Sequence, residues 1–145
     1  MKKTFLVLII VLIIFVFLII ADSKKDIDYI RIRIYDYEIN LESAITDKEQ
    51  MQGLMNREFL PKDQGMIFIY KDEKPRSFWM KNTLIPLDLI FIDSDNKIVD
   101  IKKDFQPCKT DVCETYTSKP AVYVIEVNAG IVDELGIEIG EKIEL

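Results

Sequence analysis

The most unusual residues of this chain are two acidic side chains placed inside apolar, strand-like runs. Asp88 stands in the run LDLIFI and Glu126 in the run VYVIEV. Burying a carboxylate costs free energy unless a cation or hydrogen-bond donors meet it. Two interpretations stay open: a structural ion pair, in which Arg57 meets Asp88 or Glu126 and ties a helix to a sheet, or a polar binding site.

The binding-site interpretation adds the segment around the only tryptophan. Trp79 offers an aromatic face for stacking, and Lys81 and Asn82 follow it directly with polar groups. In this interpretation Lys81, Asn82 and the two buried carboxylates hold a small polar ligand against the ring. Two carboxylates are also what an acid and base pair needs for glycosidic bond cleavage, given a suitable separation and one raised pKa.

The chain contains no histidine, which narrows the possible chemistry. Ser-His-Asp and Cys-His catalysis and HExxH zinc sites are excluded, so catalysis would depend on carboxylates, Lys, Tyr or Cys. Four methionines (Met51, Met55, Met66 and Met80) raise the possibility of Cu(I). Because no histidine or further cysteine supports a copper site, core packing explains them better. We expect no metal and no cofactor.

Charge and length indicate one acidic domain. All 25 acidic residues of the 145-residue chain follow residue 21, against 17 of its 19 Lys and Arg, so residues 22–145 carry a formal charge of −8. Nucleic-acid binding needs a basic face, so nucleic acid is not an expected partner. The 124 residues after the first 21 suffice for one core without metals or many disulfides.

The N-terminus predicts a membrane-inserting segment. Residues 5–21 form an unbroken apolar run of 17 residues, which spans roughly 25 Å as a helix. This length fits a short anchor or a long signal-peptide core. Lysines flank both ends, but the short N-terminal tail and the Cys108/Cys113 pair favour an extracytoplasmic domain with a local disulfide. The expected location is the cell membrane, single-pass, or secretion if the segment is cleaved.

Hydrophobic periodicity predicts a mainly β domain of α+β type. Alternation over 30–34 and 37–41 predicts two strands, and Thr46 with Glu49 predicts a helix that ends near Arg57. Further strands are expected over 65–70, 77–81, 87–93, 97–102, 121–127 and 142–145, with a turn at 93–96, a loop at 105–120 and a helix at 129–135. The predicted architecture is a single antiparallel sheet or partly closed barrel with two short helices. Its segments are 1–21 (signal peptide or anchor), 22–29 (tether) and 30–145 (domain).

Several motifs resemble one known family. They are GLMNR at 53–57, GMIF at 65–68, FWMKNT at 78–83, PLD at 86–88, VIEVNAG at 124–130 and the Gly136/Gly140 close. In this order they resemble domain-of-unknown-function family 192, a prokaryotic group, over residues 30–145. Pro107-Cys108 with Cys113 is similar to a variant in its archaeal members.

The resemblance implies a compact β-rich domain, often behind a signal sequence or anchor, and implies no activity. It carries over six candidate ligand-binding residues: Arg57, Trp79, Lys81, Asn82, Asp88 and Glu126. We therefore expect a membrane-tethered domain that binds a small polar ligand or an envelope protein without catalysis. The alternatives are a carboxylate-based enzyme acting on cell-envelope glycans and a structural accessory of the envelope.

Overall fold

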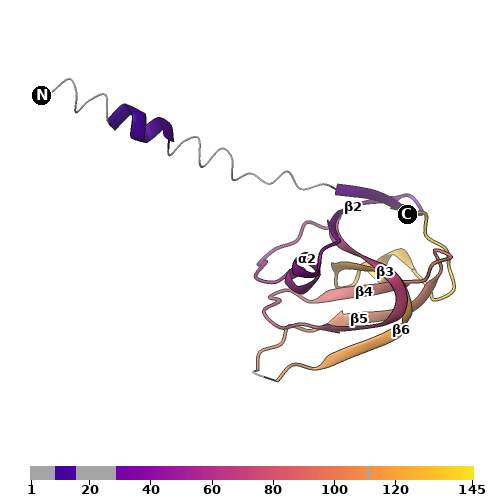
Figure 1. Cartoon of the computed structure of the whole chain (residues 1–145). Coiled ribbons are helices and arrows are strands. Elements are labelled where there is room, and N and C mark those ends of the chain that lie inside the picture. Colours follow the sequence, from indigo (N-terminus) through magenta and orange to yellow (C-terminus); the bar gives the residue numbers. More distant parts are fainter. Residues whose placement is uncertain (1–8, 16–28, 111) are drawn as a thin grey trace, which may run out of the picture.

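The body of the protein is a six-stranded sheet with strand order β1-β2-β3-β6-β4-β5 (Figure 1). The computed structural model describes residues 9–15, 29–110 and 112–145. Its strands are β1 (Tyr29–Ile34), β2 (Tyr37–Ala44), β3 (Gln64–Trp79), β4 (Leu87–Ile92), β5 (Ile98–Phe105) and β6 (Thr115–Asn128). Two short helices, α2 (Asp47–Gln52) and α3 (Ile131–Leu135), accompany the sheet. The mainly β class predicted from the periodicity is confirmed.

A third short helix covers residues 9–15. These residues belong to the predicted membrane-inserting segment, whose remaining residues, together with residues 22–28 of the predicted tether, lie outside the described part of the chain. Among the described helices, none combines the length and the apolar character needed to cross a bilayer.

The sheet is mixed and open rather than wholly antiparallel or partly closed. β2 and β3 run parallel, with Leu41 opposite Gly65, while the other neighbouring pairs are antiparallel. A long connection that contains α2 joins β2 to β3, and parallel neighbours require such a crossover. Strands β1 and β5 form the two edges of the sheet. The antiparallel prediction was therefore wrong at this one pair.

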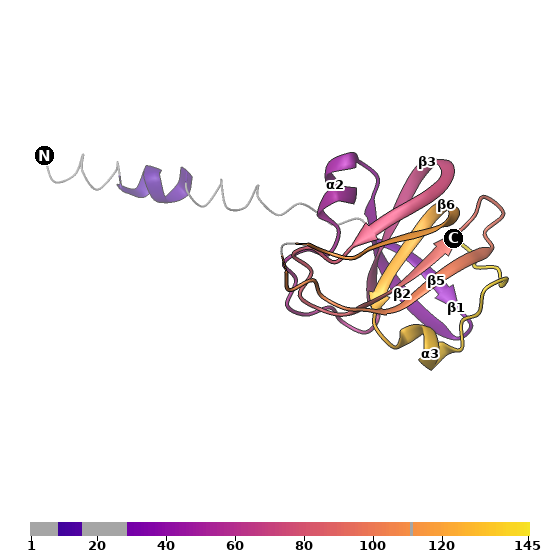
Figure 2. The same ribbon diagram turned by 90° about the horizontal axis from the view of Figure 1, so that it is seen from below.

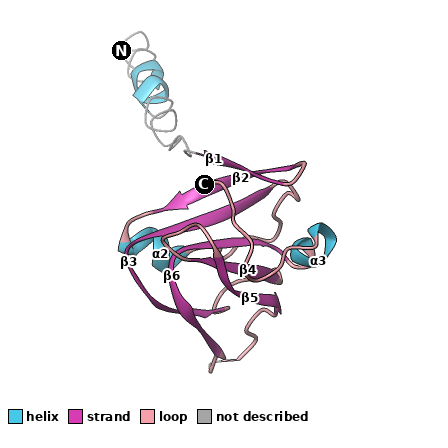
Figure 3. Ribbon diagram, turned by 90° about the vertical axis from the view of Figure 1, so that its right-hand side faces the viewer, coloured by secondary structure: helices cyan, strands magenta, loops and turns pink. Residues whose placement is uncertain are grey.

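Apolar side chains cover both faces of the sheet, because successive residues of a strand point to opposite sides. One face carries an isoleucine-rich core with Ile39, Ile67 and Ile90, covered by α3. The other face carries an aromatic core with Phe68, Phe78 and Phe91, whose rings meet edge to face at centroid distances of 5.1 and 5.7 Å. Helices α2 and α3 lie on opposite sides of the domain (Figures 2 and 3).

Both predicted helices of the domain exist, with shorter bounds than expected. Thr46 caps α2: its hydroxyl accepts from the Glu49 amide, and the Glu49 side chain accepts in return. The helix ends at Gln52 instead of near Arg57, since Gly53 adopts a positive φ of 47° at its C-cap. Gly136 ends α3 in the left-handed region, with a φ of 67°, as the sequence predicted.

Three strand predictions need correction. The runs 65–70 and 77–81 belong to one strand, β3, whose pairing with β6 shifts register between Ile69 and Lys74 and again before Ser77. The loop expected over 105–120 is shorter, because β6 already begins at Thr115. Residues 142–145 form only isolated bridges, at Lys142 and Glu144, instead of a strand. The turn at 93–96 is confirmed, with the Asp93 carboxylate accepting from the Asp95 and Lys97 amides.

The predicted local disulfide is present between Cys108 and Cys113. The Cys108 amide donates to the Met80 carbonyl at 3.2 Å. The loop before β6 is thereby tied to the end of β3. This tie fixes the segment that directly follows Trp79.

Candidate functional site

The two buried carboxylates lie on opposite faces of the sheet. In the β4–β6 pair, Asp88 stands opposite Val127 and Leu89 opposite Glu126. Residues that stand opposite each other point to the same side, whereas neighbours along a strand point to opposite sides. Asp88 therefore points into the isoleucine-rich side and Glu126 into the aromatic side. The two do not share a cleft, so the acid and base pair of the glycan-enzyme alternative is not formed by them.

Asp88 binds the backbone of two neighbouring segments. Its Oδ1 accepts from the Asp104 amide at 2.8 Å, and its Oδ2 accepts from the Gly130 and Val132 amides at 2.9 and 3.0 Å. Only 1% of Asp88 is exposed. It thus fixes the start of α3 and the end of β5 to strand β4. Hydrogen bonds from three amides compensate the burial of this carboxylate.

On the aromatic side, a groove of about 890 Å³ opens between α2 and the sheet. It receives Trp79, Lys81, Asn82 and Glu126, four of the six residues that the sequence singled out. Its other walls come from α2 and the turn after it, and from Phe68, Tyr70 and Phe78 of β3. The volume lies within the range of ordinary small-molecule sites.

Glu126 is the buried acidic group of this groove. The residue is 6% exposed, and its Oε2 is a fully buried atom with no hydrogen-bond partner in the described part of the chain. Burial raises the pKa of its carboxyl to about 8, an effect that the positive charge of Arg57 partly opposes. A protonated Glu126 carboxyl can donate a hydrogen bond, and an ionised one can only accept. In either state Oε2 has no partner among the described residues, so a group that enters the groove would have to supply it.

Arg57 pairs with Glu42, a residue that the sequence interpretation did not consider. Its Nη1 and Nη2 each lie 2.5 Å from one carboxylate oxygen of Glu42. The predicted ion pair of Arg57 with Asp88 or Glu126 was therefore wrong. Glu42 stands opposite Met66, which itself stands opposite Glu126, so all three point to the aromatic side. Because Glu42 lies at 7% exposure near Arg57, it holds the guanidinium instead of Glu126.

Trp79, Lys81 and Asn82 form the outer part of the groove. The Trp79 side chain is half exposed, and the Lys81 ammonium lies 5.3 Å from its ring centroid. Asn82 adopts a positive φ of 57°, and its carbonyl accepts from the Asn56 amide at 2.8 Å. This hydrogen bond joins the turn after α2 to the segment after β3. The two walls of the groove are thereby connected.

Several groove residues were missed by the sequence interpretation. Phe68, Tyr70 and Phe78 look like ordinary core residues in the sequence, and their place in the groove depends on the bend of β3. Glu42 carried no burial signal either, because Glu38, Asn40 and Glu42 alternate with Ile39 and Leu41, which predicts a polar, exposed side of the strand. Its burial at 7% exposure is seen only in the structure.

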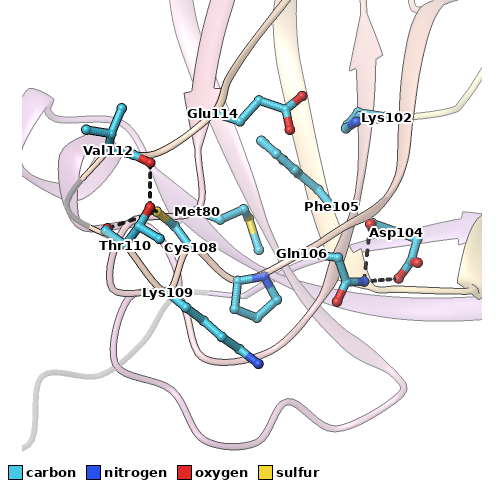
Figure 4. A pocket seen from close by; sticks show the side chains of 11 residues that line it. Met80, Lys102, Asp104, Phe105, Gln106, Cys108, Lys109, Thr110, Val112 and Glu114 are labelled. Carbon is cyan, nitrogen blue, oxygen red and sulfur yellow. Dashed lines mark hydrogen bonds between the residues drawn. The ribbon is translucent and has the colours of Figure 1, made fainter.

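A second, smaller cavity of about 330 Å³ lies beside the disulfide loop (Figure 4). The Met80 side chain, Phe105 and Cys108 line it together with the loop after β5. In Figure 4 the Gln106 amide reaches back to Asp104, with its nitrogen 2.6 Å from the carboxylate oxygen. The cavity contains none of the six predicted site residues, so the groove remains the candidate site.

Replacing Arg57 by methionine is expected to lower the free energy of unfolding by about 1 to 3 kcal/mol, because Glu42 would stay buried without its partner. Urea unfolding of the variant measures this loss. Changing Glu42 to methionine in the same chain is expected to restore part of it, since no buried charge is then left alone. Equal stability of the single variant and the parent protein would contradict the structural role of the pair.

Comparison with known proteins gives a family and two similar structures. No match was found among curated proteins. A protein of unknown function from Novosphingobium aromaticivorans DSM 12444 is 33% identical, with a TM-score of 0.73 over 82% of this chain and 85% of that one. A protein from Sinorhizobium meliloti 1021, named a "putative transcription regulator", is also 33% identical, with a TM-score of 0.71 over 82% of this chain and 96% of that one. Residues 30–145 match the model of DUF192, described as "Uncharacterized ACR", and the chain belongs to this family.

Proposed function

We propose that the domain is a binding module for a small polar ligand, which it holds in the groove between α2 and the aromatic side of the sheet. The observation that carries this proposal is the buried Oε2 of Glu126, which has no partner within the described residues and faces a groove of about 890 Å³. An unsatisfied buried polar atom is costly, and a ligand that meets it regains that cost.

The composition of the groove supports a ligand with both an apolar face and polar groups. Trp79 is half exposed at its edge, where a flat molecule can stack on the ring. Ser77, Asn82 and Thr83 add hydroxyl and amide groups along the walls. A small number of polar groups set among aromatic walls is typical of small-molecule sites. The groove therefore suits binding without a catalytic pair of carboxylates.

We also propose that this binding takes place outside the cytoplasm, next to a membrane. The apolar run over residues 5–21 supports an anchor or signal segment. The Cys108–Cys113 disulfide supports an oxidising compartment. The variant Cys pair is also the reason to place the chain with archaeal members of the family. Alkylation of intact cells with an impermeant thiol reagent, with and without reductant, tests the location; labelling only after lysis and without reductant would contradict it.

The binding function predicts that a ligand raises the unfolding temperature of the full chain in detergent. A thermal-shift screen against sugars, amines, amino acids, carboxylates and nucleotides provides the measurement, because any ligand of the native state stabilises it. Replacing Trp79 by alanine is expected to weaken a hit about tenfold, or about 1.4 kcal/mol, through loss of stacking.

Phe59→Ala is the matched control for this screen, since Phe59 is an aromatic residue with 76% exposure and does not line the groove. It should leave the affinity unchanged. A ligand that binds both variants as tightly as the parent protein would show that binding occurs elsewhere. If no compound of any class stabilises the protein, this result contradicts the binding function itself.

A further inference from the structure

The atoms around Glu126 show which chemical group is missing. Both terminal nitrogens of Arg57, the cation whose charge acts on Glu126, are engaged by Glu42 at 2.5 Å. Lys81 lies over Trp79, with its ammonium 5.3 Å from the ring centroid. Within the described residues, no donor reaches the buried Oε2. The carboxyl, which lines the groove, therefore lacks both an N–H donor and a positive charge of its own.

The walls of the groove suit a cation. Four aromatic residues line it: Phe68, Tyr70, Phe78 and Trp79. Two of these rings already attract a cation of the chain, since the Arg76 guanidinium lies 3.8 Å from the Tyr70 ring centroid and Lys81 lies over Trp79. The faces of aromatic rings attract ammonium groups, most strongly where water is excluded. Gly53 keeps the approach open, since a Cβ built there would lie 3.8 Å from Oε2 and 3.4 Å from Cζ of Phe68. A side chain at this position would occupy the space beside the carboxyl.

The charges that face Glu126 leave it without a counter-ion once it is ionised. From β2 and the turn after α2, Glu42 and Arg57 neutralise each other. From α2, Asp47 and Lys48 contribute opposite charges to the same groove. On β3, Tyr70 stays neutral because burial raises its pKa to about 12. Lys81, after β3, lies at the outer edge of the groove, where solvent screens it.

We propose that the groove binds a primary or secondary amine, whose ammonium group donates to Glu126 while its apolar body lies against the aromatic walls. This inference rests on the proposed binding function and names its ligand class. A quaternary ammonium satisfies the charge but offers no N–H to Oε2. A neutral alcohol offers a donor but no charge. Only an N–H-bearing cation satisfies both requirements.

The test compares three probes that share one aromatic body: phenethylamine, phenethyltrimethylammonium and 2-phenylethanol. Isothermal titration of the full chain in detergent at pH 6, 7 and 8 gives the affinity of each. Phenethylamine should bind at least tenfold more tightly than the other two at pH 8. Because the pKa of Glu126 is raised to about 8, an ammonium must displace its proton, so this affinity should rise about tenfold per pH unit below that value.

Glu126→Gln keeps the shape of the side chain and removes its charge. It should lower phenethylamine affinity at pH 8 at least tenfold and abolish the pH dependence. Glu138→Gln, a change of the same kind at an exposed residue outside the groove, should alter neither. Retained amine affinity in Glu126→Gln would overturn the assignment of the ammonium to Glu126.

The outcomes separate this inference from the function on which it rests. If 2-phenylethanol binds as tightly as the amine, and Trp79→Ala weakens both, the amine inference fails and the binding function stands. A neutral ligand that accepts from protonated Glu126 would show no gain in affinity from pH 6 to pH 8, in contrast to the rise expected for the amine. If neither these probes nor any compound of the thermal-shift screen binds, both proposals fail.

Discussion

The Asp88→Ala variant is expected to lose about 3 to 6 kcal/mol of unfolding free energy, because one buried and two part-buried backbone N–H groups would lose their acceptor. Each such loss costs about 1 to 3 kcal/mol, and the part-buried groups lie at the lower end because water can reach them. These amides belong to Asp104, Gly130 and Val132. Such a loss is a large part of the total stability of a small domain. Urea unfolding followed by circular dichroism measures it, and a variant that fails to fold at all agrees with the same expectation.

Asp95→Ala is the control for this change. Asp95 is an exposed residue of the β4–β5 turn, whose carboxylate accepts none of these three bonds. Its effect should stay within about 0.5 kcal/mol, as for ordinary surface substitutions. If Asp88→Ala unfolds at the same urea concentration as the parent protein yet loses ligand binding, Asp88 is a site residue and its structural role is refuted.

The Glu126→Gln variant is expected to be more stable than the parent protein at pH 8.5, by about 2 to 5 kcal/mol. Burial raises the pKa of Glu126 from 4.5 to about 8. Between these values the unfolded chain is ionised at this residue while the folded one keeps its proton. The folded state therefore binds more protons, so stability falls as pH rises through this window and levels off above pH 8. Glutamine removes this dependence because it does not titrate.

Unfolding in urea at pH 4, 6 and 8.5 measures both proteins. Below pH 4.5 the stability difference between Glu126→Gln and the parent should vanish or reverse. At this pH Glu126 is protonated in both the folded and the unfolded parent, while the buried glutamine amide still has no hydrogen-bond partner. The exposed carboxyl of Glu138 serves again as control: its change to glutamine should leave the pH profile of the parent unchanged. A parent protein that gains stability from pH 5 to pH 8 through Glu126 would refute the buried, proton-retaining carboxyl.

Local signals predicted most of the elements, and long-range pairing explains the errors. Thr46 with Glu49, and Gly136 after residue 135, set helix ends through contacts within a few residues. The parallel pairing of β2 with β3 depends instead on where the connection through α2 crosses the sheet. The charged stretch 71–76 separates two predicted strands in the sequence. In the structure the chain stays extended there, because pairing with β6 resumes at Lys74 after a register shift.

The same distinction holds for the candidate site. Alternation showed that Asp88 and Glu126 are buried acids, but it did not show that they face opposite sides, because that depends on the register of β4 against β6. The partner of Arg57 was misassigned for a related reason. Glu42 lies on a strand far from β4 in sequence, and only the β2–β3–β6 register brings its side chain to the same side as Glu126.

The pairing of Tyr29 with Glu42 has a geometric consequence for the proposed anchor. Tyr29 is the first residue of β1, and its partner Glu42 holds Arg57, so the chain enters the sheet beside this ion pair. Seven residues separate position 21 from Tyr29, and an extended chain of that length reaches at most about 25 Å. With residues 5–21 in a bilayer, Tyr29 would stay within that distance of the lipid surface, and the domain would be held close to the membrane. The domain would then bind its ligand from the thin layer of solution next to the membrane.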